Sequence, residues 1–383
     1  MRIRPMIKYL KIILPISCLA FFACPALATE EPLKGLRYWK SNTPENQHIH
    51  LLQIDPQQLK ISAAHANDSA QGLETVASIA KRHQAIAAIN GGFFKMGEAA
   101  DGLPAGILKI AGDWYGIAYQ PRGAIGWSEA KKSSQAPHTL VDRLQTKTSV
   151  YINHQKYPIH AMNQASGTNN IVLYTEAFGK NAPTKPGTRA VVIQNNRVTA
   201  IETNGETPIP KDGYVYAIGA KAKFPIEKIA PGNPATVTIE VNPEFLKEHH
   251  LAWQKVDTII GGAPLLIYGG KIIRDYAAER MPKAFIHDRY ARTAVGLLKN
   301  GEWILAIVEK NALNGSQGMT IPELAEFMKK QKCEYAVNLD GGGSSTLYIN
   351  NNVVNSPEGD EDLDMGVATL RPVSDAILIL PKK

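Results

Sequence analysis

The sequence predicts an α+β fold with mixed, strand-rich sheets and a few covering helices. Two observations carry this prediction. Short segments rich in Val, Ile, Thr and Tyr alternate with turn residues, as strands do, and few segments have helical spacing. We expect strands at residues 48–54, 59–64, 190–193, 198–203, 214–218, 235–241, 294–298 and 303–309.

The two expected helices differ in how strongly they are specified. Residues 73–83 carry apolar side chains at helical spacing. Residues 321–330 follow Thr320, with Pro322 in the first turn and Glu323 three residues after the threonine. A threonine N-cap followed by glutamate at this spacing forms a capping box, and proline is favoured where helices begin. The second segment is therefore the best-defined helix of the chain.

The first 28 residues are predicted to be a secretory signal peptide. Four basic residues precede a largely apolar stretch that runs from Ile12 to Cys24, and Ala26-Leu27-Ala28 is a small-x-small cleavage site. The stretch is too short, and too interrupted by Pro15, for a membrane span of about 20 apolar residues. We therefore expect an exported protein, periplasmic or extracellular, whose mature chain has no permanent membrane span.

Charge and cysteine content argue against several partners and sites. After removal of the signal peptide, 38 basic residues stand against 35 acidic ones, a formal charge of +3. The basic residues are dispersed, so no nucleic acid partner is expected. Cys333 is the one cysteine that stays, which excludes an internal disulfide and a cysteine zinc site. His249, His250 and His287 lack ligand spacing, and we expect neither a metal nor another cofactor.

One pattern recurs where an apolar strand runs into glycines. It occurs in Asn90-Gly91-Gly92, in Gly261-Gly262 and in Asp340-Gly341-Gly342-Gly343. Glycines at strand ends permit positive φ or the close approach of another group. At Gly261 a tight turn is the favoured interpretation, because no side chain there can do chemistry.

The segment Asn338–Ser345 is the strongest candidate site. Its consecutive glycines can gather backbone amides into an anion-binding nest, Ser344 adds a hydroxyl donor, and Asp340 supplies a carboxylate. A nucleotide P-loop is excluded, because Gly-Lys-Ser/Thr is missing and residues 345–349 have the composition of a strand. An Asx turn is the structural alternative for Asp340, but three glycines exceed what such a turn needs.

Polar residues at other strand ends can complete this site. Arg292 opens a strand and Arg371 precedes a proline, so either guanidinium suits a bidentate grip on a phosphodiester, with a surface salt bridge as the alternative. Asn90 can bind a sugar hydroxyl or phosphate oxygen, although a turn asparagine is the simpler interpretation. Glu309 ends a strand and would complete an acid–base pair if its carboxylate converges with that of Asp340.

Taken in order, these segments resemble the phosphodiester glycosidase family. The resemblance implies hydrolysis of a glycosyl-1-phosphodiester, which frees the sugar and leaves a phosphomonoester. Residues 29–383 would form the glycosidase-like domain, with 29–84 either part of it or an N-terminal strand–helix extension packed on it. The segments that carry the resemblance are Asn90–Phe94, Gly261–Pro264, Arg292–Gly296, Gly318–Glu326, Asn338–Ser345 and Arg371–Val373.

The expected site combines this resemblance with the residue chemistry. Asp340 and Glu309 are the expected catalytic pair, and the expected substrate-binding residues are Asn90, Gly91, Gly92, Arg292, Thr293, Asn338, Gly341, Gly342, Gly343, Ser344 and Arg371.

The sequence departs from the family in two places. Many relatives have Asp-Gly-Arg where this chain has Glu309-Lys310-Asn311, and many have proline where it has Ala291. The expected partner is a sugar phosphodiester or an envelope glycan. The alternative function is a non-catalytic envelope module that binds phosphorylated glycans.

Overall fold

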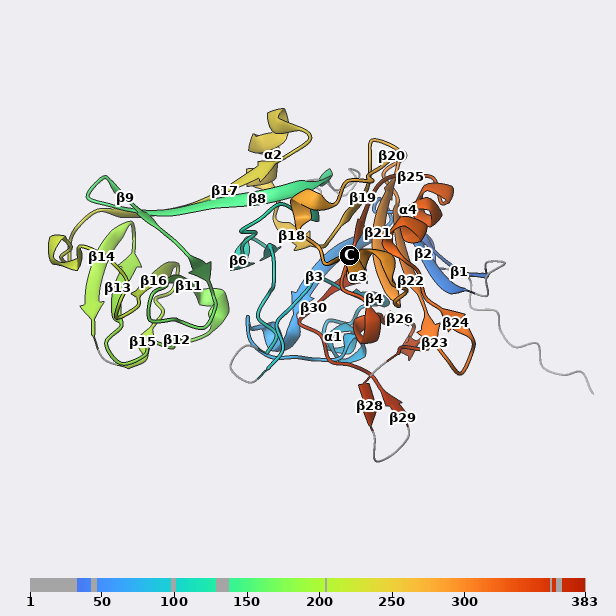
Figure 1. Cartoon of the computed structure of the whole chain (residues 1–383), viewed down its shortest axis with the longest axis horizontal. Helices are drawn as coiled ribbons and strands as arrows, with labels where there is room; N and C mark the ends of the chain where they lie inside the picture. The colour runs from blue at the N-terminus through green and yellow to red at the C-terminus, as the bar shows by residue number, and fades with distance from the viewer. Residues whose placement is uncertain are drawn as a thin grey trace, which may run out of the picture. The chain divides into compact units, whose positions relative to one another are not determined.

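The computed structural model describes residues 33–42, 47–97, 101–128, 138–203, 205–358, 360–362 and 367–382. The predicted signal peptide lies outside these residues. The chain from Lys34 onward forms one compact unit, shown in Figure 1. Within the described part of the chain, no helix is long and apolar enough to cross a membrane.

Sheet 1 contains seven antiparallel strands in the order β1-β2-β22-β21-β25-β19-β20. Its strands are β1 (Leu36–Asn42), β2 (His48–Ile54), β22 (Trp303–Val308), β21 (Arg292–Leu298), β25 (Cys333–Asn338), β19 (Leu265–Tyr268) and β20 (Lys271–Ile272).

Sheet 2 has the order β27-β26-β4-β30-β3 and is also antiparallel. It is made of β27 (Asn352–Val353), β26 (Leu347–Ile349), β4 (Ala87–Asn90), β30 (Asp375–Pro381) and β3 (Leu59–His65). The central strands β4 and β30 are apolar and buried almost throughout.

Sheet 3 has the order β17-β8-β7-β18-β5-β6, with β9 paired to β8. Its strands are β17 (Ala235–Pro243), β8 (His138–Ile152), β7 (Arg122–Ser128), β18 (Thr258–Gly261), β5 (Leu108–Ile110), β6 (Asp113–Gly116) and β9 (Gln155–Pro158).

Sheet 4 has the order β10-β11-β16-β13-β14. Its strands are β10 (Ala161–Met162), β11 (Ile171–Thr175), β16 (Gly213–Ile218), β13 (Arg189–Gln194) and β14 (Arg197–Glu202). Three two-stranded pairs join β12 (Asn181–Ala182) to β15 (Thr207–Pro208), β23 (Lys310–Asn311) to β24 (Ser316–Gln317) and β28 (Asp360–Asp362) to β29 (Val367–Thr369).

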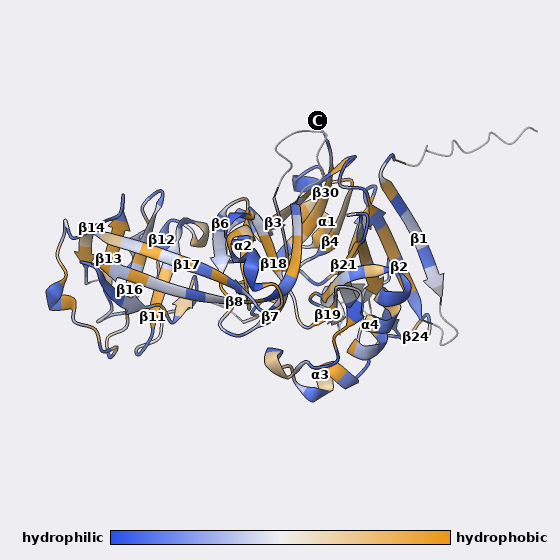
Figure 2. Ribbon diagram, turned by 90° about the horizontal axis from the view of Figure 1, so that it is seen from above, coloured by the Kyte–Doolittle hydropathy of each residue, from blue (hydrophilic) through white to orange (hydrophobic). Residues whose placement is uncertain are grey.

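The α-helices of the described residues are short: α1 (Val76–Arg82), α2 (His250–Lys255), α3 (Lys283–His287) and α4 (Ile321–Lys330). Helix α4 alternates between hydrophobic and hydrophilic residues in Figure 2, and its apolar side is buried against sheet 1. Thr320 accepts a hydrogen bond from Glu323 N, and the Glu323 carboxylate accepts one from Thr320 N. The predicted capping box is confirmed.

The strand-rich architecture with few helices is confirmed, and each of the eight expected strands is present within a residue or two of its expected bounds. Strands predominate so strongly that the α+β label describes the fold only loosely. The expected strand 303–309 ends at Val308, which leaves Glu309 just beyond it.

The N-terminal segment is built into the main sheets. Strands β1 and β2 form one side of sheet 1, and β3 forms one edge of sheet 2. Helix α1 packs on the apolar faces of β4 and β30. The described part of residues 29–84 therefore contributes strands to sheets 1 and 2 and a helix that packs on sheet 2.

Candidate functional site

Three glycine-rich strand ends, from three different sheets, meet at one place. They follow β4, β18 and β25, and we call them the glycine corners (residues 90–92, 261–263 and 338–343). The amide of Asp340 donates to Gly91 O at 3.1 Å, and the amide of Ala263 donates to Asn338 O at 2.8 Å. These backbone hydrogen bonds tie the corners together although they are distant in sequence.

Glycine is required where the corners touch. A Cβ atom on Gly92 would lie 2.7 Å from Gly261 O, and one on Gly262 would lie 2.2 Å from Asn338 O. Both distances are shorter than real Cβ contacts, and both neighbours are backbone atoms that cannot move aside cheaply. The Gly261-Gly262 pair, for which the sequence favoured a simple tight turn, is therefore the contact point of the other two corners.

Buried polar side chains hold together the junction, the place where the three glycine corners meet. Asn90 Nδ2 donates to Asp340 O at 2.8 Å, while Asn90 Oδ1 accepts from Thr293 Oγ1 at 2.9 Å and from Thr346 N at 3.2 Å. The side chain of Asn338 donates to Ala263 O at 2.7 Å. Asn90, Thr293 and Asn338 are thus engaged by the protein itself, and they orient the backbone that carries Asp340.

The carboxyl group of Asp340 is partly buried at this junction. Burial raises its pKa to about 6, and the negative charge of Asp375 acts in the same direction. Hydrogen bonds from Ser344 and from Gly341 N, the latter at 3.0 Å, and the positive charge of Arg371 favour the ionised form without offsetting burial. A carboxyl group that titrates close to neutrality suits proton transfer.

Asp375 is a second carboxylate at the junction, and the sequence interpretation missed it. Its Oδ1 accepts from Gly92 N at 2.9 Å, its backbone oxygen accepts from Gly91 N at 2.9 Å, and the Ser374 hydroxyl donates to its Oδ2. The side chain is buried. Its only signal in the sequence was an acidic residue at the start of the final apolar strand, close after Arg371.

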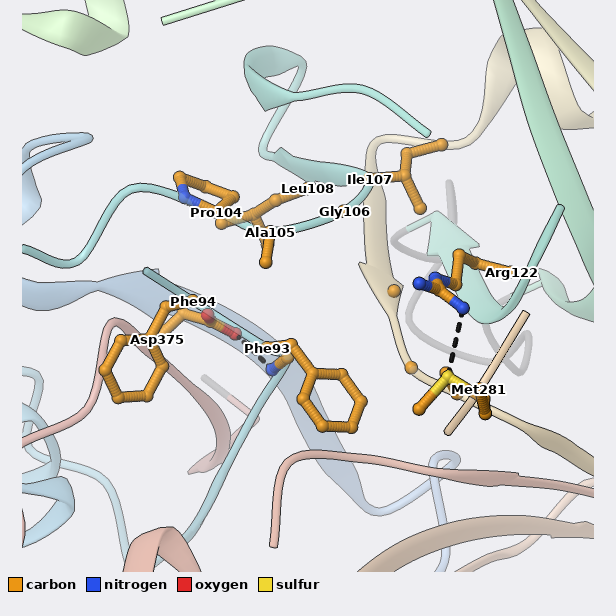
Figure 3. A pocket seen from close by; sticks show the side chains of 14 residues that line it. Phe93, Phe94, Pro104, Ala105, Gly106, Ile107, Leu108, Arg122, Met281 and Asp375 are labelled. Carbon is orange, nitrogen blue, oxygen red and sulfur yellow. Dashed lines mark hydrogen bonds between the residues drawn. The ribbon is translucent and has the colours of Figure 1, made fainter. Parts of the chain in front are cut away.

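A cavity of about 250 Å³ opens beside the corners. Its wall includes the backbone of Gly92 and of 261–263, together with the side chains of Phe93, Arg122 and Asp375. Figure 3 shows Asp375 and Arg122 on opposite sides of this space, with the Phe93 ring between them. The cavity therefore has an anionic side, a cationic side and an aromatic surface.

The glycines after Asp340 do not form an open nest. The amide of Gly341 donates to Asp340 Oδ1, that of Gly342 to Ala291 O at 2.8 Å, and that of Ser344 to Gly341 O. Of these glycines only Gly342 has a positive φ, 61°. The expectation of an open anion-binding nest is therefore corrected. These three amides donate to oxygens of the protein itself, as the alternative of a structural turn at Asp340 expects.

Gly343 allows the close approach of Arg371. A Cβ atom on Gly343 would lie 2.5 Å from Arg371 Cζ. The structure therefore brings Arg371 to the Asp340 corner, where its charge acts on the carboxyl group.

Arg292 is buried, and its guanidinium donates hydrogen bonds to backbone carbonyls. Nε donates to Met319 O at 2.8 Å, and Nη2 donates to Phe285 O at 2.8 Å and to Asp288 O at 3.0 Å. Burial lowers its pKa to about 10. The ring of Phe285 packs edge-on against Phe93 at a centroid distance of 5.9 Å. This geometry favours a positioning role for Arg292 over the expected grip on a phosphodiester.

Glu309 lies in a different cluster. Its carboxylate accepts from His50 Nε2 at 2.8 Å, from Asn314 Nδ2 at 2.6 Å and from Ser356 N at 2.6 Å, beside a separate cavity of about 230 Å³. Strand β21 separates the strand that precedes Glu309 from the one that precedes Asp340. The carboxylate close enough to act electrostatically on Asp340 is that of Asp375.

The described residues contain no group of three or more His, Cys, Asp and Glu side chains arranged to hold a metal ion. The thiol of Cys333 is free and buried, and burial raises its pKa to about 12.

The fold and the site define a strand-rich protein with two neighbouring carboxyl groups. Asp340 lies on a glycine corner, and Asp375, at the start of β30, lines a small cavity beside the corners. Residues 188–380, half of the chain, match the sequence profile of the phosphodiester glycosidase family. The chain therefore belongs to this family.

Two curated relatives differ in how much they share. An uncharacterised protein of Rickettsia conorii is 22% identical over 268 residues, which cover 68% of this chain and 87% of the relative. The mouse N-acetylglucosamine-1-phosphodiester alpha-N-acetylglucosaminidase is 37% identical over 73 residues, which cover 19% of this chain and only 14% of the mouse protein.

A solved structure resembles the whole unit. A hypothetical protein from Synechocystis superposes with a TM-score of 0.74 at 25% identity, over 91% of this chain. The chain spans 62% of the length of that protein.

Proposed function

We propose that the protein is an exported hydrolase that cleaves glycosyl-1-phosphodiesters, releasing the sugar and leaving a phosphomonoester. One observation carries this proposal beyond family membership. The two carboxyl-bearing residues are hydrogen-bonded to one dipeptide: Asp340 N donates to Gly91 O, while Asp375 Oδ1 accepts from Gly92 N. Of these residues, Gly92 and Asp375 line the cavity, and Asp340 is joined to it through Gly91. Glycoside hydrolysis commonly uses a pair of carboxyl groups that flank the scissile bond.

We assign the two carboxyl groups different roles. A phosphate is already a good leaving group, so help from a general acid matters less than charge stabilisation. Asp340, with its pKa of about 6, acts in its ionised form and takes a proton from the attacking water. The water oxygen bonds to the anomeric carbon as the carbon–oxygen bond to phosphate breaks. Asp375 stabilises positive charge on the sugar, and Arg371 stabilises the departing phosphate.

Other residues of the expected site support this arrangement. We propose that Asn90, Thr293 and Asn338 hold the backbone of the corners, and that Arg292 fixes α3 and thereby Phe93. These are positioning roles. Glu309, the expected partner of Asp340, is proposed to order the segment at Ser356 through its hydrogen bond from that amide.

The substrate is proposed to be a sugar phosphodiester or an envelope glycan that contains one. The predicted signal peptide supports export of the enzyme to the periplasm or out of the cell. Mature chain from residue 29 onward should therefore be active without its leader.

The decisive experiment measures free sugar released by the mature chain from a UDP-sugar and from a synthetic methyl glycosyl phosphodiester. We expect Asp340→Asn and Asp375→Asn each to lower the rate by at least about 100-fold, the range of acid–base contributions. Asp257→Asn changes an exposed carboxylate and should leave the rate unchanged. Absence of turnover on a broad panel would overturn the proposal, and ligand binding without release would favour a non-catalytic glycan-binding module instead.

A further inference from the structure

Arg122 is the cationic residue on the cavity wall opposite Asp375 (Figure 3). It begins β7 and is half-buried. Its Nη1 donates to the backbone oxygen of Glu279 and lies 3.0 Å from Met281 Sδ. In the described residues, no carboxylate oxygen lies within 4.0 Å of this guanidinium to form a salt bridge with it.

The nearest carboxylate is committed elsewhere. Glu279 is fully buried, and its side chain accepts from Gly123 N at 2.9 Å, from Leu265 N at 2.9 Å and from Arg143 Nε at 3.1 Å. Glu279 forms its ion pair with Arg143, whose guanidinium also pairs with Glu244 at 2.8 Å. Burial lowers the pKa of Arg122, and the charge of Glu279 offsets this only in part. A partly buried cation without a paired anion is costly, so this wall favours an incoming anion.

The size and lining of the cavity limit the size of the group that can carry this anion. Small-molecule sites usually measure about 300–1000 Å³, whereas this cavity measures about 250 Å³. It has room for one compact group, such as a phosphate or a single sugar ring, but not for an oligosaccharide. The Phe93 ring offers the aromatic face on which a sugar ring packs, between the cationic and anionic sides.

We infer that Arg122 is the anion-recognition residue of this cavity and binds an oxyanion of the substrate, a role that the sequence suggested for Arg292 and Arg371. The guanidinium fork matches the geometry of phosphate and carboxylate groups alike. The oxyanion has two possible sources, the phosphodiester itself or an acidic substituent on the sugar. As far as the substrate is concerned, this inference rests on the proposed function.

Calorimetric titration of the mature chain with inorganic phosphate and with glucuronate tests the inference without requiring turnover. We expect Arg122→Gln to weaken binding of at least one anion tenfold or more, and Arg122→Lys to retain part of the affinity. Arg274→Gln is the matched control, because Arg274 is exposed and pairs with Glu326. This variant should bind both anions with the affinity of the wild type. Thermal unfolding of each variant establishes that it is folded. Equal affinity in Arg122→Gln and wild type, or binding of neither anion by the wild type, would overturn the inference.

Turnover distinguishes the two sources. If Arg122 binds the phosphodiester, Arg122→Gln should raise KM for a UDP-sugar and leave hydrolysis of a neutral nitrophenyl glycoside unchanged. If it binds an acidic sugar, the loss should be confined to substrates with a uronic acid. An equal loss on neutral and charged substrates would contradict both. If the wild-type protein binds phosphate through Arg122 but hydrolyses no phosphodiester, the proposed function is refuted while the anion site is supported.

Discussion

His50 donates a hydrogen bond from Nε2 to Glu309 Oε1 at 2.8 Å, and both side chains are buried. The hydroxyl of Tyr38 lies 2.9 Å from the other ring nitrogen, Nδ1. A ring that carries its hydrogen on Nε2 can therefore donate to Glu309 and accept from Tyr38 together. This chain of three side chains links β1 and β2 to the end of β22, so it joins three neighbouring strands of sheet 1.

Glu309→Gln is expected to lower the free energy of unfolding by about 1–3 kcal/mol at neutral pH, the usual cost of weakening buried hydrogen bonds to a charged group. Burial alone would raise the pKa of Glu309, but hydrogen bonds from His50, Ser356 and Asn314 and the charge of His50 lower it below its ordinary 4.5. The stabilisation is therefore complete above pH 4.5 and is lost as the pH falls through the folded-state pKa.

Urea unfolding between pH 3 and pH 7 measures this effect. The difference between wild type and Glu309→Gln should shrink toward acid pH. Glu248→Gln, which changes an exposed carboxylate, should behave as the wild type throughout. A constant difference at every pH would show that the charge of Glu309 contributes nothing to stability.

Asp340→Asn is expected to stabilise the protein at neutral pH while it abolishes activity. The folded-state pKa of Asp340 is about 6, above its ordinary 3.8. The folded state thus disfavours the ionised carboxylate, and wild-type stability falls as the pH rises from about 4 through 6. Asparagine carries no such cost. At pH 7.5 the gain should be on the order of 1–2 kcal/mol, after allowance for the partial exposure of Asp340.

Thermal unfolding at two pH values checks this prediction. The variant should melt higher than the wild type at pH 7.5 and at nearly the same temperature at pH 3.5, where Asp340 of the folded wild type is protonated. A lower melting temperature of the variant at pH 7.5 would mean that Arg371 and the Ser344 hydrogen bond outweigh the burial of the carboxylate. A matching activity profile should rise with a midpoint near pH 6, because the ionised form is the active one.

The sequence predicted best the features that depend on neighbours along the chain. The capping box at Thr320 and Glu323 is local, and α4 has its expected bounds. The glycine corners were visible as local patterns too. Their junction was not, because it depends on hydrogen bonds between Asp340 and Gly91 and between Ala263 and Asn338, which only the pairing of three sheets creates.

Side-chain roles were harder to predict than positions. Whether an arginine faces a ligand or a carbonyl depends on burial, and the sequence cannot show that Arg292 is enclosed while Arg122 faces a cavity. Asp375 was missed because it opens an apolar strand without any glycine or motif of its own. Glu309 follows a strand as expected, but the histidine that fixes its carboxylate comes from β2, far away in the chain.

Arg292→Lys is expected to destabilise the fold and to lower activity together. A lysine cannot reach Met319 O, Phe285 O and Asp288 O at once, so about 2–3 kcal/mol should be lost with the missing hydrogen bonds and the buried charge. Because α3 carries Phe285 against Phe93, kcat should fall with stability. If Arg292 gripped the substrate directly, the lysine variant would keep its melting temperature and lose affinity alone, which steady-state kinetics beside thermal unfolding would reveal.

Gly262→Ala tests the junction of the corners most directly. Its Cβ atom would lie 2.2 Å from Asn338 O, so either β18 or the Asp340 corner must shift. Forcing an extra carbon into a packed interior costs about 1–3 kcal/mol, and the displaced backbone leads directly to Asp340. We therefore expect a lower free energy of unfolding and loss of sugar release in the same variant.

Gly106→Ala is the matched control for that substitution. Gly106 also borders the cavity, but a Cβ atom there would meet no atom within 4 Å, and its φ is not in the positive range. Its stability should stay within about 0.5 kcal/mol of the wild type. Urea unfolding and the sugar-release assay on both variants decide the matter. Equal stability of Gly262→Ala and Gly106→Ala would show that the backbone of the corners shifts to accommodate the added carbon at no cost. In that case the contact between the corners does not hold Asp340 in place.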